Sequence, residues 1–461
     1  MSSPSPGNTD LKLVFAPRGA LNQPPLGIAT LKSYLELNGF DVTCEDLSAR
    51  YFLSNMEGVP DYYYDDSLWY QDNSPNDIPS PLATFLEVTA QRLAASPQRF
   101  LGFSLMVGNV WPSIYLSRRV RELNPLITII LGGPHCVLNW QELMKSSKAD
   151  FIVLGDGENT LIHILRGCCR DNKCSVSGLI PRNGGGIPVL STQVNLDHLP
   201  PPDFSDFPLD AYKLHCPGGR RLLPVMRSKG CIFDCPFCSR KVHDDGYRMR
   251  GGSGFVKELG FLSHKYNARD FYFVDSLINP TAQAMEELVE ELSNIDLGIS
   301  WRANAATSHF MRAPLLSRLR EHGCGRLNYG LETGSSKVRR TMHKPDDMDL
   351  VGSILRETHD VGIVVNIWLM VGYPTEGEDE FQETMDFLEK YADVIDAVQI
   401  SSCSIIPGTD LQKSPERYGI RTVGLGQDWA SDLSTPEQRV DRAARLRRKA
   451  EQLGLGSSRA L

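Results

Sequence analysis

The sequence predicts an α/β protein made of a doubly wound, Rossmann-like N-terminal domain and a partial (β/α)6 barrel of the TIM type. Short apolar runs alternate with amphipathic stretches over residues 11–170, and a second alternation covers residues 221–410. Apolar strands that alternate with helices form parallel sheets with both faces covered. The second alternation contains six strand–helix repeats, fewer than the eight that close a complete barrel, so we expect this barrel to be open.

The first domain contains five apolar runs of strand length and several segments with helical periodicity. The expected strands are residues 11–16, 40–47, 99–105, 126–131 and 151–154, and the expected helices are residues 26–38, 111–123 and 159–166. An acidic, aromatic insertion over residues 55–81 interrupts this alternation, with residues 61–66, Trp69 and Tyr70 at its centre. Long connections in compact domains are often functional. The insertion is therefore expected either to cap a site or recognise substrate, or to be a solvated loop.

Irregular segments flank the second domain. Residues 171–220 contain a triple glycine and a triple proline and are expected to form a linker that is partly a short hairpin. The expected barrel strands are residues 222–226, 270–274, 299–303, 326–331, 364–371 and 397–403, with helices that include residues 281–292 and 377–391. Residues 1–10 are expected to be a disordered tail, and residues 411–461 a short helical C-terminal extension.

Composition excludes several partners. Lys and Arg total 48 against 56 Asp and Glu, which gives a formal charge of −8 without a long basic run. This balance argues against nucleic acid or an anionic membrane as the main partner. The longest apolar runs, residues 126–132 and 363–371, are far shorter than the roughly 20 residues that span a bilayer. We therefore expect a cytoplasmic protein without a membrane span, and the N-terminal residues show no secretory signal.

Eleven cysteines are present, and three of them fall within eight residues, at Cys231, Cys235 and Cys238. The odd total and the length of the chain favour a reducing compartment, where clustered thiols more often bind metal than form disulfides. The trio directly follows the first strand of the second alternation, which is where barrel enzymes carry reacting groups. Three thiolates can hold an iron–sulfur cluster. A zinc site would need a fourth ligand, such as His215 or Cys216, and chance clustering is the third interpretation.

The spacing Cys-x3-Cys-x2-Cys, with the aromatic Phe237 just before the last cysteine, resembles the signature of radical S-adenosylmethionine (SAM) enzymes. In that family three cysteines ligate a [4Fe-4S] cluster, SAM chelates the remaining iron, and one electron cleaves SAM to a 5′-deoxyadenosyl radical. The resemblance implies that Cys231, Cys235 and Cys238 are the metal ligands and catalytic residues, and that Phe237 contacts the cofactors. It also implies an external one-electron reductant of the flavodoxin or ferredoxin type.

Later segments resemble the same family in the same order. Asp275 follows an aromatic strand, Glu332 lies in a Gly-Leu-Glu-Thr-Gly-Ser segment, and Gly372 and Pro374 lie in a Gly-x-Pro-x-Glu turn. Residues 406–409 resemble the end of the sixth strand. The resemblance implies that Asp275, Glu332, Gly372 and Pro374 bind cofactor. The structural alternatives are a helix cap for Asp275 and a salt bridge for Glu332.

One position departs from the family pattern. Relatives often carry an arginine several residues after the tryptophan of the third strand, whereas here Arg302 immediately follows Trp301. Adjacent strand residues point to opposite faces of a sheet. Arg302 is therefore not assigned the role of that arginine.

The first domain resembles the cobalamin-binding domain that is fused to many radical SAM enzymes. No Gly-x-Gly-x-x-Gly follows the first strand, which argues against a dinucleotide. The glycine-rich turns that carry the resemblance follow predicted strands, at the edge where open α/β sheets bind ligands, and glycines let a ligand approach the backbone. The residues implied in cobalamin binding are Ser104, Gly132, Gly133, His135, Gly155 and Glu158. His135 has the alternative of an ordinary turn residue, and residues 17–23 contain no histidine that could lie below cobalt.

Together these resemblances imply a cobalamin-dependent radical SAM methyltransferase that acts on an unactivated carbon. Its cofactors would be a [4Fe-4S] cluster, S-adenosyl-L-methionine and cobalamin, and its substrate a small molecule or peptide, methylated through methylcobalamin and a 5′-deoxyadenosyl radical. One alternative keeps these cofactors for ring contraction or oxidative cyclisation without methyl transfer. A more remote alternative is a non-enzymatic cobalamin or redox sensor.

Overall fold

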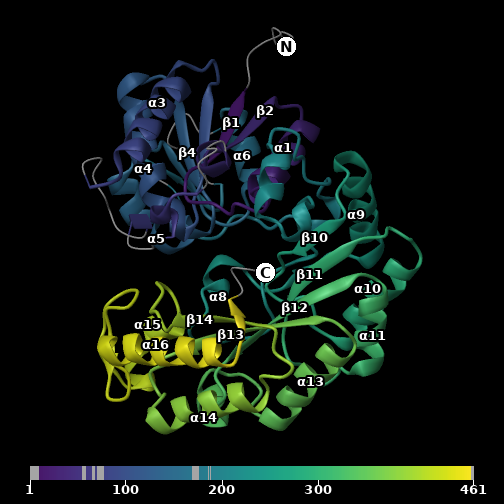
Figure 1. Cartoon of the computed structure of the whole chain (residues 1–461). Coiled ribbons are helices and arrows are strands. Elements are labelled where there is room, and N and C mark those ends of the chain that lie inside the picture. Colours follow the sequence, from purple (N-terminus) through teal and green to yellow (C-terminus); the bar gives the residue numbers. More distant parts are fainter. Residues whose placement is uncertain are drawn as a thin grey trace. The chain divides into compact units, whose positions relative to one another are not determined.

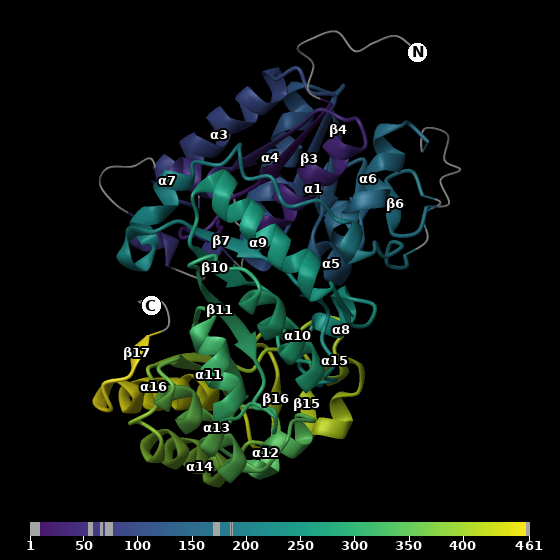
Figure 2. The ribbon, with the colours of Figure 1, turned by 90° about the vertical axis from the view of Figure 1, so that its right-hand side faces the viewer.

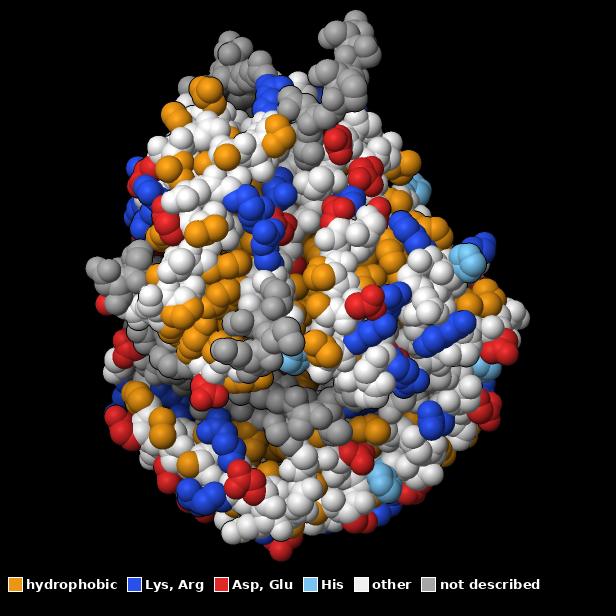
Figure 3. Space-filling model, turned by 45° about the horizontal axis from the view of Figure 1, so that its top comes forward, with side chains coloured by type: hydrophobic (Ala, Val, Ile, Leu, Met, Phe, Trp, Pro, Cys, Tyr) orange, Lys and Arg blue, Asp and Glu red, His pale blue; other side chains and the backbone are white. Residues whose placement is uncertain are grey.

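The structure is a computed structural model that describes residues 10–53, 59–64, 68–69, 77–168, 176–184, 186 and 188–457. The chain divides into two compact units, Met1–Pro224 and Val225–Leu461 (Figure 1). Apart from Asp10, the tail predicted over residues 1–10 lies outside the described residues. Among the described residues, no helix has the length and apolar composition needed to cross a membrane. Lys and Arg are interspersed with Asp and Glu on the face that Figure 3 shows.

The first unit is built on a six-stranded sheet in the order β2-β1-β3-β4-β5-β6. All neighbouring strands are parallel except the pair β5 and β6. The strands are β1 Leu11–Phe15, β2 Val42–Asp46, β3 Phe100–Ser104, β4 Thr128–Gly132, β5 Phe151–Val153 and β6 Leu179–Pro181. The helices are α1 Leu26–Leu37, α3 Ser80–Ala95, α4 Val110–Leu123, α5 Pro134–Ser146, α6 Gly157–Leu165 and α7 Leu209–Tyr212. This order is a doubly wound fold whose strand order reverses between β1 and β3, which confirms the predicted fold class.

The described part of the insertion belongs to the hydrophobic core of this unit. Trp69 is 1% exposed, stacks on Trp111 with ring centroids 6.0 Å apart, and donates its indole N–H to the carbonyl of Tyr62. Tyr63 donates its hydroxyl to the carbonyl of Gly19, in the loop that follows β1. Asp65, Asp66 and Tyr70 lie outside the described residues. The buried aromatics exclude a fully solvated loop for the described part of the insertion.

Residues predicted as a linker also belong to the first unit. Strand β6 extends its sheet as an antiparallel edge, and the hydroxyl of Tyr212 in α7 donates to Asp46 at 2.6 Å. Phe204, Phe207 and Tyr212 are buried. Isolated aromatic residues between prolines show no periodicity, so the sequence pattern alone gave no sign that this segment packs against the domain.

The second unit is an open, curved sheet in the order β7-β10-β11-β12-β13-β14-β17. Its strands are β7 Leu222–Val225, β10 Asp270–Phe273, β11 Ser300–Ala305, β12 Cys324–Glu332, β13 Val364–Val371, β14 Ala397–Ser402 and β17 Gly456–Ser457. Its helices are α8 Arg240–His243, α9 Gly252–Tyr266, α10 Ala282–Ser293, α11 Ala313–Glu321, α12 Ser336–Thr341, α13 Met348–Asp360, α14 Glu378–Lys390, α15 Asp410–Lys413 and α16 Pro436–Gln452. Helices α10, α11, α13 and α14 lie along the outer side of the sheet (Figures 1 and 2). The six predicted strands are β7 and β10–β14, which confirms a partial barrel.

Two short hairpins and one added strand complete this unit. The hairpins are β8 Ser228–Lys229 with β9 Arg248–Met249, and β15 Ile420–Thr422 with β16 Ala430–Ser431. Strand β17, close to the C-terminus, pairs with β14. The predicted C-terminal extension therefore contributes a strand to the barrel sheet.

The two faces of the barrel sheet differ in chemistry. Trp301 is buried on the helix side and stacks on Phe273, whereas Arg302 lies over the ring of Tyr272 on the inner side. Trp301 and Arg302 therefore point to opposite faces of the sheet, as expected for adjacent strand residues. The inner side also carries a chain of three asparagine amides across neighbouring strands, formed by Asn304, Asn328 and Asn366. The inside of the open barrel therefore carries polar side chains as well as apolar ones, unlike the apolar filling of a closed barrel.

Candidate active site

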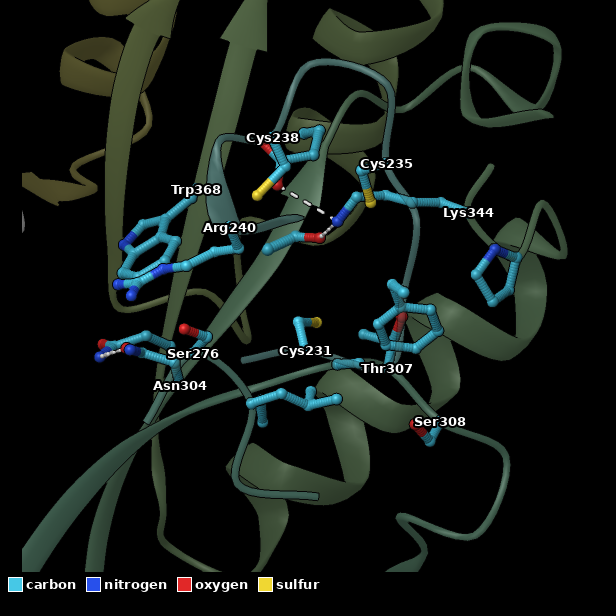
Figure 4. Close-up of a pocket in the computed structure, with 18 of the residues that line it drawn as sticks. Cys231, Cys235, Cys238, Arg240, Ser276, Asn304, Thr307, Ser308, Lys344 and Trp368 are labelled. Atoms are coloured by element: carbon cyan, nitrogen blue, oxygen red, sulfur yellow. Dashed lines mark hydrogen bonds and ion pairs between the residues drawn. The ribbon is translucent and has the colours of Figure 1, made fainter. Parts of the chain in front are cut away.

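The three clustered thiols line one cavity of about 260 Å³ in the second unit (Figure 4). Cys231, Cys235 and Cys238 come from the loop that follows β7 and the first strand of the β8–β9 hairpin, and the amide of Cys238 donates to the carbonyl of Cys235 at 3.1 Å. Burial raises the pKa of the Cys235 thiol to about 11 and also raises that of Cys238. Phe237 and Glu332 line the same cavity, so the structure brings five predicted site residues together.

The arrangement is compatible with an iron–sulfur cluster. Among the described residues, no three His, Cys, Asp or Glu side chains are grouped as ligands of one metal ion. Each thiolate of a cubane cluster binds a different iron, so a cluster does not need its thiols to converge on one point. Of the fourth zinc ligands suggested by the sequence, the Cys216 thiol donates to the carbonyl of Asn22 at 3.0 Å.

Glu332 enters the cavity through an irregularity at the end of β12. The register between β12 and β13 shifts between Gly330 and Glu332, and Glu332 has a φ of 71°. A bulge re-aims the side chain of the strand that carries it. The carboxylate of Glu332 lies 3.2 Å from the ammonium of Lys344, which also donates to the carbonyl of Gly330 at 2.8 Å. The salt bridge kept as an alternative for Glu332 is therefore present, in a residue that also lines the cavity.

Asp275 does not line the cavity; its neighbours Ser276 and Leu277 do. The Asp275 side chain is 1% exposed, and burial raises its pKa to about 6. Its carboxylate accepts from the backbone amides of Arg227 and Ser228 and from the hydroxyl of Ser228. Asp275 therefore holds the backbone just before Cys231, and its direct contact with cofactor stays a prediction.

Replacing Asp275 with alanine should loosen the backbone that leads into the cysteine loop. The substitution leaves two buried amides without their acceptor, which costs on the order of 2–4 kcal/mol of unfolding free energy. Urea denaturation of the full-length chain measures this cost, and the iron content after reconstitution should fall in parallel. Asp349→Ala is the matched control, because the Asp349 side chain is 94% exposed. Equal stability and iron content in the Asp275 variant would show that the clamp is dispensable.

Gly372 and Pro374 form a turn that does not line the cavity but contacts a residue that does. Gly372 has a φ of 73°, and a Cβ atom there would lie 2.2 Å from Cγ of Arg439, so only glycine fits. Tyr373, between the two, packs edge-on against Phe237 with ring centroids 6.2 Å apart. The turn thus reaches the cysteine loop through an aromatic contact. Cofactor binding by Gly372 and Pro374 stays a prediction.

Glu376 closes this turn and makes its stability depend on pH. Its carboxylate accepts from the amide of Gly372 at 2.5 Å and lies 3.6 Å from Arg442, yet burial raises its pKa to about 7. A raised carboxyl pKa gives stability that is fully present below the unfolded value near 4.5 and is lost as pH rises through 7. Glu376→Gln cannot ionise. The unfolding free energy of the parent should therefore fall relative to that of Glu376→Gln, by up to about 3 kcal/mol, as the pH rises from 5 to 8.

Urea titrations of both proteins at several pH values test this. Asp393→Asn is the control, because a hydrogen bond from Arg356 lowers the pKa of Asp393 and this carboxyl stays ionised throughout that range. The stability difference between that variant and the parent should be constant from pH 5 to pH 8. A constant difference for Glu376→Gln as well would contradict the raised pKa.

The residues predicted to contact cobalamin lie at the carboxyl edge of the first sheet. Ser104 and Gly132 end β3 and β4, Gly133 precedes α5, and Gly155 and Glu158 lie after β5. Gly133 has a φ of 101°, and a Cβ atom there would lie 2.7 Å from the carbonyl of Leu105. The structure therefore gathers these turns at the edge where ligands of open α/β sheets bind.

His135 at the start of α5 offers a buried donor at this edge. Burial lowers its pKa to about 4, so the ring is neutral at physiological pH. Nε2 lies 3.2 Å from the amide of Asn139, and Nδ1 is buried without a hydrogen-bond partner. Buried polar atoms are rarely left unpaired. A bound molecule with polar side chains, such as a corrin, would satisfy this atom.

Several residues that shape both sites were missed by the sequence analysis. Asn109 is fully buried and bonds to the carbonyls of Ala16 and Ser104, joining the loops after β1 and β3. Arg240, Lys344 and the paired amides of Asn304 and Asn328 line the cavity of the second unit. The period-two alternation of polar and apolar residues in β11 and β12 was the signal that could have found the two amides.

Comparison with known proteins agrees with both sites. Residues 225–388 match the model of the radical SAM superfamily, and residues 75–165 match the B12 binding domain. An uncharacterized methyltransferase of Pyrococcus horikoshii is 24% identical over 318 residues, covering 68% of each chain. An anaerobic magnesium-protoporphyrin IX monomethyl ester cyclase of Rubrivivax gelatinosus is 25% identical over 290 residues, covering 60% of this chain and 52% of the cyclase.

A solved structure shows the same fold over nearly the whole chain. It is the radical SAM methyltransferase TsrM of Kitasatospora setae, with a TM-score of 0.68 at 15% identity over 96% of this chain and 89% of TsrM. TsrM has also been solved with cobalamin and a [4Fe-4S] cluster bound. The two domain matches imply the same cofactors, with SAM, for this chain. The chain belongs to the cobalamin-dependent radical SAM family, with a B12-binding domain followed by a radical SAM domain.

Proposed function

We propose that this enzyme is a methyltransferase that transfers a methyl group from SAM to an unactivated carbon. The observation that carries the proposal is the gathering of Cys231, Cys235, Cys238 and Glu332 around one cavity, in a chain with a matched B12 binding domain. The methyltransferase relatives support methyl transfer as the outcome. When bound, the cluster and SAM would supply a 5′-deoxyadenosyl radical, and cobalamin would carry the methyl group.

The residues of the chain have separate tasks in this proposal. The three thiolates hold the cluster, and the Phe237–Tyr373 contact keeps the loop packed against the barrel. The amides of Asn304 and Asn328 offer donors and acceptors to a molecule in the cavity. Asn304 donates to the carbonyl of Asp275 at 2.8 Å, and Asn328 donates in turn to Asn304 at 3.0 Å. A backbone carbonyl can only accept, so this first bond sets the orientation of the whole amide chain.

Two further proposals concern the partners of the enzyme. Its electron would come from an external one-electron reductant of the flavodoxin or ferredoxin type. Its substrate would be a small molecule or a peptide. We place the enzyme in the cytoplasm, where reducing conditions keep the ligand thiols free.

The second candidate function keeps the cofactors but omits methyl transfer. The similarity to an anaerobic cyclase favours it, because that relative covers 60% of this chain. In this alternative the radical would start a ring contraction or oxidative cyclisation.

Product analysis separates the two functions. The full-length chain is reconstituted anaerobically with iron, sulfide and cobalamin, then reduced with titanium citrate in the presence of SAM. Mass spectrometry should find S-adenosylhomocysteine together with 5′-deoxyadenosine. Formation of 5′-deoxyadenosine without S-adenosylhomocysteine would support the cyclase alternative, and formation of neither would overturn both functions.

A further inference from the structure

Two non-glycine residues with a left-handed backbone lie beside the cysteine loop. Among the described residues, the non-glycine residues with positive φ are Asn267, Glu332 and His343. Asn267 ends helix α9, where asparagine is common in this conformation. His343 likewise follows the end of helix α12, where its amide donates to the carbonyl of Arg340. Glu332 has no such helix end, so its left-handed backbone is strained. Strain of this kind persists where the surrounding contacts require it, often at functional sites.

Lys344, which follows His343, places a positive charge inside the cavity. Its side chain is 16% exposed and lies above Gly330, where a Cβ atom would be 3.4 Å from Nζ. Figure 4 shows Lys344 extending past Cys235, with its ammonium joined by dashed lines to the Gly330 carbonyl and the Glu332 carboxylate. The same charge acts on the Cys235 thiol and opposes the effect of burial on its pKa. Lys344 thus lies between a predicted cluster ligand and the carboxylate of the cavity.

Other contacts hold this segment in place. The guanidinium of Arg339 is 2% exposed and donates to the carbonyls of Leu331 and Pro345 at 2.6 and 2.5 Å. It therefore ties the residue before Glu332 to the residue after Lys344. On the other side, the ring of His343 lies 3.4 Å from the carboxylate of Asp234, within the cysteine loop. These contacts hold the backbone on both sides of Lys344 and limit the movement of its ammonium.

We propose that Lys344 is a positioning residue that orients the Glu332 carboxylate and raises the potential at which the cluster accepts its electron. The proposal rests on the cluster site proposed above. The step adds one electron from the external reductant to the cluster, without bond formation, so the cluster gains one negative charge. A fixed cation in a poorly solvated cavity stabilises the reduced state more than the oxidised state. The negative charge of Glu332 has the opposite effect and lowers this potential.

Potentiometric titration monitored by electron paramagnetic resonance tests this on the reconstituted full-length chain without SAM. Lys344→Met should shift the midpoint potential to more negative values, and Lys344→Arg should restore it. Glu332→Gln should shift the midpoint to less negative values, and this variant decides the sign even if Lys344→Met fails to fold. Lys337→Met is the matched control, because Lys337 also pairs with a glutamate, Glu380, but is 63% exposed and lies outside the cavity lining.

The outcomes separate this inference from the proposed function. A parent chain that assembles no cluster would overturn the cluster site itself. A parent chain with an intact cluster, together with a Lys344→Met midpoint equal to that of the parent, would overturn only the role of Lys344. A purely structural role predicts a lower unfolding free energy for Lys344→Met with an unchanged midpoint, and that result would also overturn the inference. A shift of the midpoint potential to more negative values in Glu332→Gln would contradict the opposite effects proposed for Glu332 and Lys344.

Discussion

Replacing any one of Cys231, Cys235 or Cys238 with alanine should abolish formation of 5′-deoxyadenosine by the reduced enzyme. Each thiolate is expected to hold a separate iron, so the loss of one leaves two irons without a protein ligand. Iron and labile sulfide per chain should fall to a small fraction of the parent value after anaerobic reconstitution. All three side chains are partly exposed. Their replacement should therefore change the unfolding free energy by less than about 1 kcal/mol.

Colorimetric iron and sulfide assays, with mass spectrometry of the SAM products, measure these effects. Cys168→Ala is the matched control, because this thiol is free and exposed in the first unit. It should retain the cluster and the products of the parent. A variant of Cys231, Cys235 or Cys238 that keeps the spectrum of a four-iron cluster would contradict the assignment. A parent protein that carries stoichiometric zinc would contradict it as well.

Local sequence pattern was sufficient for most of the barrel. The predicted strand at residues 364–371 coincides with β13, and the strand predicted at 270–274 differs from β10 by one residue. Both are predominantly apolar or aromatic runs, and each is followed by a glycine or an acidic residue that marks where the strand ends. The cysteine loop could be found for the same reason, because its ligands are close together in the chain.

Features that depend on distant contacts could not be predicted. Helix α5 begins at Pro134, directly after Gly133, in a segment that the sequence presents as a glycine-rich turn. Lys344 reaches the cavity only because Arg339 and the left-handed helix end at His343 bring its loop beside β12. The role of Asp275 as a clamp depends on backbone amides of a different strand–loop junction. None of these relations leaves a periodic or spaced signal in the sequence.

The C-terminal segment shows most clearly how tertiary contacts change the interpretation of a sequence. A short helical extension is predicted over residues 411–461, and the charged helix α16 lies within it, with Thr435 as its cap. A charged helix suggests a solvated extension, yet Arg439 in α16 is 1% exposed. Its guanidinium lies 3.9 Å from the ring centroid of Trp429 and donates to the carbonyls of Gln427 and Trp429. Its aliphatic stem packs against Gly372.

Arg439→Ala should therefore destabilise the whole second unit rather than release a free tail. The substitution removes the cation–π contact, leaves buried carbonyls without donors and opens a cavity behind Gly372. Effects of these kinds together cost on the order of 3–5 kcal/mol of unfolding free energy. Because the turn at Gly372 carries Tyr373, which packs on Phe237, the cluster content should fall as well.

Urea denaturation and iron assays on the full-length chain measure both effects. Arg448→Ala on the same helix is the control, because this side chain is exposed, and its unfolding free energy should stay within about 0.5 kcal/mol of the parent. If Arg439→Ala unfolds at the same urea concentration as the parent and binds as much iron, α16 is a detachable extension. A loss confined to the Arg439 variant would instead show that the last helix helps to hold the turn that supports the cysteine loop.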